Sequence, residues 1–537
     1  MENLGAGSGK RPKRNKARTR SRDRERRGDE FPAEVVTPGR TYPNHGIRIT
    51  PFAGEFERVF PEPAGLAGLA GEVWPPTQVR YLDVYLRQLN CQTVVIEEHY
   101  IDRDYMADHA LFYSKSLRAY PNHCRRLHFF SESFDDVRFK RLVAEANQRG
   151  HDEVIRGLQR SYLGFCVVRP LPGCPLGRTV LPPPTNGGTT AVYRALREYV
   201  AHLAGFTLHV RGLAFQQQDQ GVSACATTAL WSSIHRVAEM EGLRAPTPAE
   251  ITEAASRYLL ADGRSLPSEG LSIHQMCEAI RAAGLAPLVI RSVSLEPDLA
   301  QFLGYATSGF APILAIQPVA GGVGHAVCGV GVRLGEVKPQ TNPTLHYRDG
   351  ASAVCGAYVH DDRLGPYAIA DFSAFTHEGA IRTAVTIHWP DRVEDEQSLL
   401  YALVVPVPIK LRLPITRIRV LGLAIADAAG QLFKRFDSSA TLNCCYEMGT
   451  DYRRRAYGFG LSDEGLYALV SSIVLSRYVG LIEITSPEGP LFDVLLDTTE
   501  TAANPAALAC IRREVLRDRG VDELRFIATK LGAHYIA

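Results

Sequence analysis

The stretch FQQQDQGVSACATTALWSSIH, residues 215–235, delivers a single cysteine after three glutamines and a turn, at the start of an apolar run. Between Ala224 and Gly242 the apolar residues recur at helical spacing, which predicts a helix that begins near Cys225 and ends at Gly242. A thiol in a first helical turn lies close to unpaired backbone N–H groups and to the positive end of the helix dipole. Both favour the thiolate, which is the nucleophilic form. The position of Cys225 therefore indicates nucleophilic catalysis.

A thiolate that attacks a carbonyl group needs donors for the oxyanion that forms. The side-chain amide of an upstream glutamine, together with the backbone N–H of Cys225, would make a two-donor oxyanion hole. Gln220 and Gln218 are the candidates, and the sequence leaves the choice between them open.

The proton of the thiol needs a base, and His325 is the candidate. Residues 311–332, APILAIQPVAGGVGHAVCGVGV, are two β-like runs joined by a glycine-rich turn, and His325 opens the second run. Glycines permit close backbone approach, so the ring can face a cleft. His325 is thus placed to take and return a proton.

A carboxylate that orients the imidazole is expected at the end of the next strand. Residues 357–367, AYVHDDRLGPY, end a short apolar run in two adjacent aspartates. Such a carboxylate accepts from the imidazole N–H and fixes its tautomer. Side chains alternate across a strand, so only one of Asp361 and Asp362 faces His325 unless the strand bulges. Asp371 is a further alternative.

The chain order of cysteine, histidine and aspartate resembles the papain-like cysteine peptidases, above all the branch that processes bacteriocin precursors with double-glycine leaders. Three stretches carry the resemblance: DQGVSACATTALW, then GLSIHQMCEAIRAAGLAPLVI at 270–290, and finally APILAIQ…GHAVCGVGV with VHDDRLG. The similarity covers roughly residues 205–385. Segment 333–356 would be an insertion relative to that branch.

By position, the resemblance implies that Cys225 is the nucleophile, His325 the base and Asp361 the residue that orients it, because Asp361 stands four before Gly365. The family's glutamine stands six before the cysteine, where this chain has Asp219, and Gln220 and Gln218 lie on either side of it. The resemblance implies no metal and no cofactor.

The length and composition indicate a multidomain globular chain of the α+β class. The chain has 537 residues, 45% of them hydrophobic and 22% charged, which is too long for a single core. We expect a central papain-like fold, an N-terminal α+β region before it and a β-rich α+β domain after it. The predicted segments are a disordered basic tail (1–30), an irregular lead-in (31–74), an N-terminal α+β domain (75–180), a linker (181–190), a papain-like domain (191–400) and a C-terminal domain (401–537).

Residues 1–30 contain eleven Lys/Arg against five Asp/Glu, a net charge of +6, and have no apolar face. Such a segment cannot bury enough surface to offset its ordering entropy. It is expected either to solubilise the protein or to contact polyanions weakly, as nucleic acid or anionic lipid.

Other classes of protein are disfavoured. The basic start has no apolar segment after it and no run of about 18 apolar residues exists, so neither a secretory signal nor a membrane span is predicted. The eleven cysteines include no CxxC pair, which disfavours a disulfide framework or a zinc site and favours a cytoplasmic location. The acidic residues and histidines between 97 and 109 match no metal motif.

Within the flanking regions, the sequence predicts a helix, a strand and a helix or turn over 79–114, and two helices and a strand over 139–172. Residues 415–425, ITRIRVLGLAI, are predicted to be a strand. A last helix is predicted from Asn504, as N-cap, to Gly520.

The function expected from the sequence is a cytoplasmic thiol hydrolase that cleaves a peptide or isopeptide bond in a protein substrate, through a Cys225–His325–Asp361 triad. Two alternatives stay open: a transglutaminase-type acyl transferase on the same residues, and a non-catalytic scaffold that binds a protein or nucleic acid. The flanking domains would select the substrate.

Overall fold

The computed structural model describes residues 46–54, 56–60, 75–149, 151–171, 173–185, 190–219, 221–222, 224–257, 270–338, 345–390, 395–434, 440–499, 506–516 and 520–537. The predicted basic tail, most of the predicted lead-in and part of the predicted linker lie outside these residues. From His45 to Ala537 the chain forms one compact unit. Helices and strands occur in comparable amounts, so the chain belongs to the mixed α+β class.

The N-terminal part of this unit is an antiparallel sheet in the order β1-β2-β3-β4-β5. Its strands are β1 (Ile47–Pro51), β2 (Thr93–Tyr100), β3 (Cys124–Phe130), β4 (Tyr162–Val168) and β5 (Leu176–Val180). Its helices are α1 (Thr77–Gln88), α2 (Arg103–Leu111), α3 (Asp136–Arg149) and α4 (His151–Ser161). The sequence predicted the order of elements over 79–114 and 139–172 correctly. It was wrong at β1, which lies inside the predicted irregular lead-in and is held there by its pairing with β2.

The central sheet contains a closed ring of six strands. Neighbours pair in the order β10-β11-β13-β14-β15-β16, and β16 pairs again with β10, so the ring is a small barrel. The ring strands are β10 (Ile313–Pro318), β11 (His325–Leu334), β13 (Val354–Asp361), β14 (Gly365–His377), β15 (Ala380–Ile387) and β16 (Glu396–Val407). Two further strands add to its outside: β6 (Thr190–Val192) on β11 and β9 (Ala286–Arg291) on β16.

Helices surround this barrel, and a separate hairpin joins it to the N-terminal sheet. The helices are α5 (Cys225–Glu241), α6 (Pro248–Ala255), α7 (Ile273–Ala282) and α8 (Leu295–Thr307). Helix α5 packs on β11 and β16, whereas α8 closes the apolar core of the barrel with Leu299 and Phe302. The hairpin consists of β7 (Arg197–Leu203) and β8 (Phe206–Gly212).

A second sheet forms the C-terminal part, in the order β12-β17-β18-β19-β20-β21. Its strands are β12 (Tyr347–Asp349), β17 (Ala440–Met448), β18 (Tyr478–Ser486), β19 (Gly489–Asp497), β20 (Ala507–Arg512) and β21 (His534–Ile536). Its helices are α9 (Ile415–Ala428), α10 (Gly430–Phe433), α11 (Gly449–Ala456), α12 (Asp463–Tyr467) and α13 (Val521–Leu531). Strand β12 comes from segment 333–356, so this segment ties the C-terminal sheet to the barrel.

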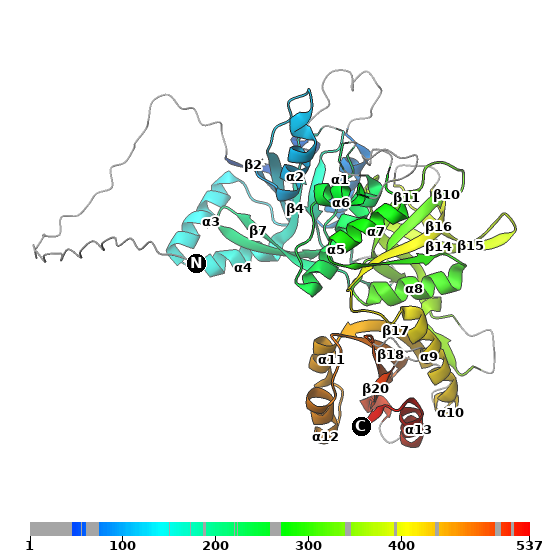
Figure 1. Ribbon diagram of the computed structural model, residues 1–537. Helices are drawn as coiled ribbons and strands as arrows, with labels where there is room; N and C mark the ends of the chain where they lie inside the picture. Colours follow the sequence, from blue (N-terminus) through cyan, green and yellow to red (C-terminus); the bar gives the residue numbers. More distant parts are fainter. Residues whose placement is uncertain are drawn as a thin grey trace, which may run out of the picture. The chain divides into compact units, whose positions relative to one another are not determined.

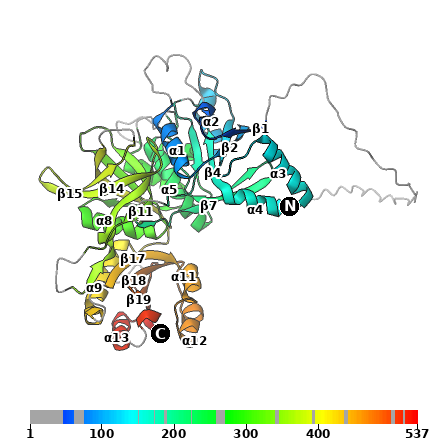
Figure 2. The same cartoon turned by 180° about the vertical axis from the view of Figure 1, so that it is seen from behind.

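The C-terminal sheet is covered on both faces. Helices α11 and α12 lie on one face, while α9, α10 and α13 lie on the other (Figures 1 and 2). Alternate residues of β18 divide between the two apolar cores: Leu481 packs with Tyr452 of α11, whereas Ile482 packs with Ile418 of α9.

Two predictions in this region were wrong. Residues 415–425 form most of α9 rather than a strand, because Ile415, Ile418, Gly422 and Ile425 are buried at helical spacing. Residues 507–512 form β20 rather than the predicted last helix. Gly520, with φ of 70°, precedes α13 instead of ending a helix.

None of the helices in the described part of the chain has the length and apolar character needed to cross a membrane.

Candidate active site

Cys225 is the first residue of α5, as the sequence predicted. The helix ends at Gly242, whose φ of 68° is left-handed. Ala224 occupies the N-cap position with extended backbone and offers no side-chain acceptor to the first turn. The first-turn N–H groups are therefore not capped by Ala224, and the half-buried thiol lies beside them.

His325 is the first residue of β11, directly after the glycine-rich turn. Gly321 and Gly322 have φ of 85° and 121°, which a residue with a side chain rarely adopts, so this sharp entry depends on glycine. The buried ring bonds through Nε2 to Oδ1 of Asp361 at 2.9 Å. Cys225 and His325 line the same cavity, and the thiol is one of the groups that raise the pKa of this ring. Because Nε2 is engaged by Asp361, Nδ1 is the nitrogen that remains for the thiol.

The electrostatic surroundings favour a charged His325. Burial alone would lower its pKa, but the charge and hydrogen bond of Asp361, the hydrogen bond of Cys225 and the charge of Asp362 together raise the pKa to about 10. The ring is therefore an imidazolium at neutral pH and can donate a proton.

Both aspartates of the predicted pair lie near the ring. Asp361 is the last residue of β13 and Asp362 begins the turn after it, so the alternation of side chains along a strand does not separate the two. Asp361 bonds Nε2 of His325, and Oδ1 of Asp362 lies 3.8 Å from the same nitrogen. Oδ2 of Asp362 is buried without a hydrogen-bond partner among the described residues. Asp361 is the closer and better bonded of the two.

The two carboxyl groups differ in charge. Burial would raise the pKa of Asp361, but His325 and Arg363 hold it well below its usual range. Asp361 also accepts from the backbone N–H of Arg363 at 2.9 Å. Burial and the charge of Asp361 raise the pKa of Asp362 to about 7, although His325 and Arg363 oppose this. At neutral pH Asp361 is ionised, and Asp362 is divided between its two forms.

Arg363 is a residue of this site that sequence reasoning missed. Its guanidinium lies 3.3 Å from Oδ2 of Asp361 and 2.9 Å from Glu396 of β16. Arg363 directly follows two acidic residues, and this position is the only local signal that could have suggested its pairing with Asp361.

A cavity of about 430 Å³ opens at Cys225 and His325. Most of its wall is apolar or glycine, and its polar lining residues besides these two are Ser272, Gln275, Gln317 and Tyr401. Ser272 and Gln275 form the capping box of α7, in which Oε1 of Gln275 accepts from the Ser272 N–H. The amide nitrogen of Gln275 is thereby left for other partners. Sequence reasoning did not select Gln275 or Gln317.

The predicted glutamine of the oxyanion hole is not assigned by the structure. Gln220 lies outside the described residues, and Gln218 is half-buried and is not among the described residues that line the cavity. Asp219, between them, is committed elsewhere. Its Oδ1 accepts from the N–H groups of Gly221 and Val222 at 2.8 and 2.6 Å, and its Oδ2 pairs with Arg169.

The remaining polar candidates have structural partners. Asp371 pairs with Arg333 and His388 rather than with His325. His360, on the other face of β13, bonds the carbonyl of Leu213, and burial lowers its pKa to about 3.

One group in the described residues has a donor set that would suit a metal ion. Single donor atoms of His325, Asp361 and Asp362 lie within 4.8 Å of one another. Asp361, however, already binds two cationic side chains, His325 and Arg363, so its oxygens are used within the protein. In the acidic stretch between 97 and 109, Glu97 pairs with Arg126, Glu98 with Arg48, and Asp102 with Arg178.

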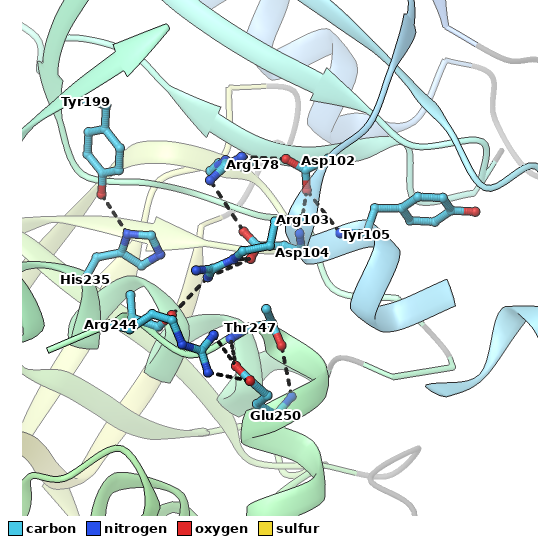
Figure 3. Close-up of polar contacts among 11 residues, drawn as sticks. Asp102, Arg103, Asp104, Tyr105, Arg178, Tyr199, His235, Arg244, Thr247 and Glu250 are labelled. Atoms are coloured by element: carbon cyan, nitrogen blue, oxygen red, sulfur yellow. Dashed lines mark hydrogen bonds and ion pairs between the residues drawn. The ribbon is translucent and has the colours of Figure 1, made fainter. Parts of the chain in front are cut away.

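Contacts from outside the barrel reach α5 and the segment between α5 and α6 (Figure 3). Arg178 of β5 bonds Asp102, which caps α2, at 2.6 Å. Arg103 in turn donates to the carbonyl of Ala245, just before α6. Tyr199 of β7 bonds Nδ1 of His235 in α5 at 3.1 Å. Elements outside the barrel thus contact the nucleophile helix through Tyr199 and the segment after it through Arg103.

Searches with protein-family models and against curated protein sequences find no match to this chain.

Proposed function

We propose that this protein is a thiol hydrolase that cleaves a peptide or isopeptide bond, with Cys225 as nucleophile, His325 as general acid and base, and Asp361 as the residue that orients His325. One observation carries the proposal. The thiol at the start of α5 and a histidine whose Nε2 is held by a buried carboxylate face one cavity.

The reaction follows from these positions. The thiolate of Cys225 attacks the substrate carbonyl carbon and forms a C–S bond, while the carbonyl oxygen takes the negative charge and accepts from the Cys225 N–H. The His325 imidazolium then donates its proton to the leaving amine as the C–N bond breaks. Water attacks the resulting thioester and gives a proton to His325. The C–S bond breaks, the acid leaves, and the thiolate and the imidazolium are restored.

The proposed architecture is papain-like. The nucleophile lies at the start of α5, which packs on the barrel. The base lies at the start of β11, and the carboxylate that orients it lies at the end of β13. The packing of α5 on β11 supports this assignment. Apart from Cys225 and His325, the lining of the cavity has no charged side chain among the described residues, which favours an uncharged stretch of substrate next to the scissile bond.

The test combines labelling with cleavage. Iodoacetamide is expected to alkylate Cys225 faster than the other cysteines at neutral pH, as followed by peptide mass spectrometry. A quenched peptide library built on neutral residues should be cleaved by wild type and not by Cys225→Ala. Cys277→Ala is the matched control, because Cys277 is also half-buried and lies on the adjacent helix α7.

Labelling of Cys225 at the rate of Cys277, with no cleavage of any library member, would refute the proposal. If product appears only when a primary amine is added, and carries that amine, the protein is instead an acyl transferase on the same residues.

A further inference from the structure

A second cavity lies beside helix α1, and no described residue lines both it and the Cys225 cavity. Its volume is about 580 Å³, which falls in the range of about 300–1,000 Å³ that is typical of small-molecule sites. Its walls come from α1, β13, β14, residues 184–185 and the neighbourhood of Trp389.

Aromatic residues form a large part of the walls of this cavity. Its five aromatic residues are Tyr81, Tyr85, Tyr358, Tyr367 and Trp389. The rings of Tyr85 and Tyr367 stack with centroids 5.8 Å apart, and their hydroxyls donate to the carbonyls of Pro182 and Leu181. The two rings are held in place by these bonds, so stacking a flat ligand against the wall costs little ordering entropy.

The charges at the polar end of the cavity are already paired. His388 bonds Asp395 through Nδ1 at 2.6 Å and Asp371 through Nε2 at 2.8 Å. Asp371 also pairs with Arg333. His388 and Arg333 therefore already engage both carboxylates, and a charged ligand would lose its hydration without gaining a free partner. Gln88 and Thr185 add an amide and a hydroxyl to the lining.

The cavity touches the turn that carries Asp361. The ring of Tyr81 lies against Gly365, where an added Cβ would come within 2.2 Å of it. Gln78, also on α1, donates to the carbonyl of Asp362 at 3.1 Å. Arg363, which pairs with Asp361, lies over the ring of Trp389 at 5.7 Å. A ligand against Tyr81 and Trp389 thus presses on the groups that position Asp361.

We propose that this cavity is an effector site for a neutral, flat aromatic molecule, and that its occupancy changes the reactivity of Cys225 through the turn at 361–365. The binding site stands by itself, whereas the effector role rests on the proposed function of Cys225.

Indole is the probe, with tryptamine and indole-3-acetate as its cationic and anionic counterparts and cyclohexylmethanol as an alicyclic one. Saturation-transfer NMR on the full chain should show indole binding with a Kd of about 1 mM or tighter, and the other three at least about tenfold weaker. Ile369→Trp, from β14, and Val84→Trp, from α1, fill the cavity from opposite walls and should abolish binding. Val293→Trp is the control, because Val293 is 62% exposed and lies outside the lining.

The coupling is read from the rate of Cys225 alkylation, which needs no substrate. Saturating indole should change that rate by about fivefold or more in wild type, the lower end of usual coupling, and leave it unchanged in a filled variant. If wild type and both filled variants bind indole equally, or if a charged probe binds more tightly, this cavity is not a site for a neutral aromatic molecule. Binding without any change in the alkylation rate would overturn the effector role. Neither result depends on whether a peptide is cleaved.

Discussion

His325 lies within 4 Å of two carboxylates that are adjacent in the chain, and their roles separate by charge. Oδ1 of Asp361 is 2.9 Å from Nε2, and Arg363 and a backbone N–H also hold its carboxylate. Asp362 lies 3.8 Å away with one oxygen unpaired. The bonded, ionised Asp361 is therefore expected to stabilise the imidazolium, and Asp362 to modulate it.

Asp361→Asn should lower kcat by as much as about 10⁴, because it keeps the shape but removes the charge beside the imidazolium. Asp362→Asn, its matched control, should change the free energy of unfolding by on the order of 1 kcal/mol at neutral pH and leave most activity. The measurement is kcat/KM of both variants, with melting curves. Activity lost in Asp362→Asn and kept in Asp361→Asn would reverse the assignment.

Because the pKa of Asp362 is raised to about 7, the stability of the folded protein is expected to depend on pH. Between the usual carboxyl pKa of about 4 and this value, the folded protein holds a proton that the unfolded chain has released. The contribution of Asp362 to stability therefore falls as pH rises from about 4 to about 7, and is constant above. Asp362→Asn removes this contribution.

The melting temperature of Asp362→Asn minus that of wild type is thus expected to grow from pH 5 to pH 8. In wild type the stabilising contribution of His325 is full below about 6.5 and declines as pH rises toward about 10. In Asp362→Asn this decline ends at a lower pH, because the charge of Asp362 no longer helps to raise the pKa of His325. A difference that stays flat with pH would mean that Asp362 is already ionised in the folded protein at pH 5.

At the scale of the element, the start of α5 combines a reactive residue with a weak helix cap. Ala224 has the extended backbone of an N-cap, with φ of −84° and ψ of 171°, but no acceptor. Elsewhere in the chain, Thr247 and Ser272 cap α6 and α7 with full capping boxes. The missing cap at α5 leaves its first-turn N–H groups to stabilise negative charge on the thiol or on a substrate oxyanion.

Ala224→Asn and Ala224→Asp should both stabilise the protein by about 1 kcal/mol, because each supplies the missing side-chain acceptor. Asparagine and aspartate have nearly the same shape, so the two variants differ mainly in charge. Only the aspartate adds a charge beside the thiolate, so it should slow alkylation of Cys225 at neutral pH by about tenfold relative to the asparagine variant. The rates are compared by mass spectrometry at one pH. Identical rates in the two variants would show that Cys225 does not react as a thiolate.

On the scale of the whole molecule, the N-terminal part supports both loops of the proposed site. Arg169, just after β4, pairs with Asp219 in the approach to Cys225, and both side chains are buried. Gly221, in the same approach, lies against Phe112. Helix α1 contacts the turn at 361–365. The region expected to select substrates is therefore also part of the frame that positions the candidate catalytic groups.

Asp219→Asn should lower the free energy of unfolding by about 3 kcal/mol, because it leaves the buried Arg169 without its counter-charge. The same change at Asp451, which pairs with Arg454 on the surface, should cost less than about 1 kcal/mol. Combining Asp219→Asn with Arg169→Met should restore most of the loss. Chemical denaturation measures the free energy of unfolding of each variant. If Asp219→Asn costs no more than Asp451→Asn, the Arg169–Asp219 pair does not hold the approach to Cys225 in place.

The sequence by itself determined those features that depend on local pattern. The helical period from Ala224, with Gly242 as its stop, located α5 and its first residue, Cys225. The glycine turn before His325 and the strand that ends at Asp361 were likewise readable, because glycine and alternating apolar residues act over a few neighbours. The mixed α+β class followed from the same local periods.

Tertiary structure decided whatever depends on partners distant in the chain. The 415–425 segment carries apolar residues that fit either a strand or a helix, and burial of one helical stripe against β17 and β18 selected the helix. The end of β13 at Asp361, which leaves Asp362 in the turn, depends on how β13 pairs with β14. Arg363, Arg169 and α1 act through residues tens to hundreds of positions away. Local periodicity carries no information about such pairings, because they are selected by the packing energy of the whole unit.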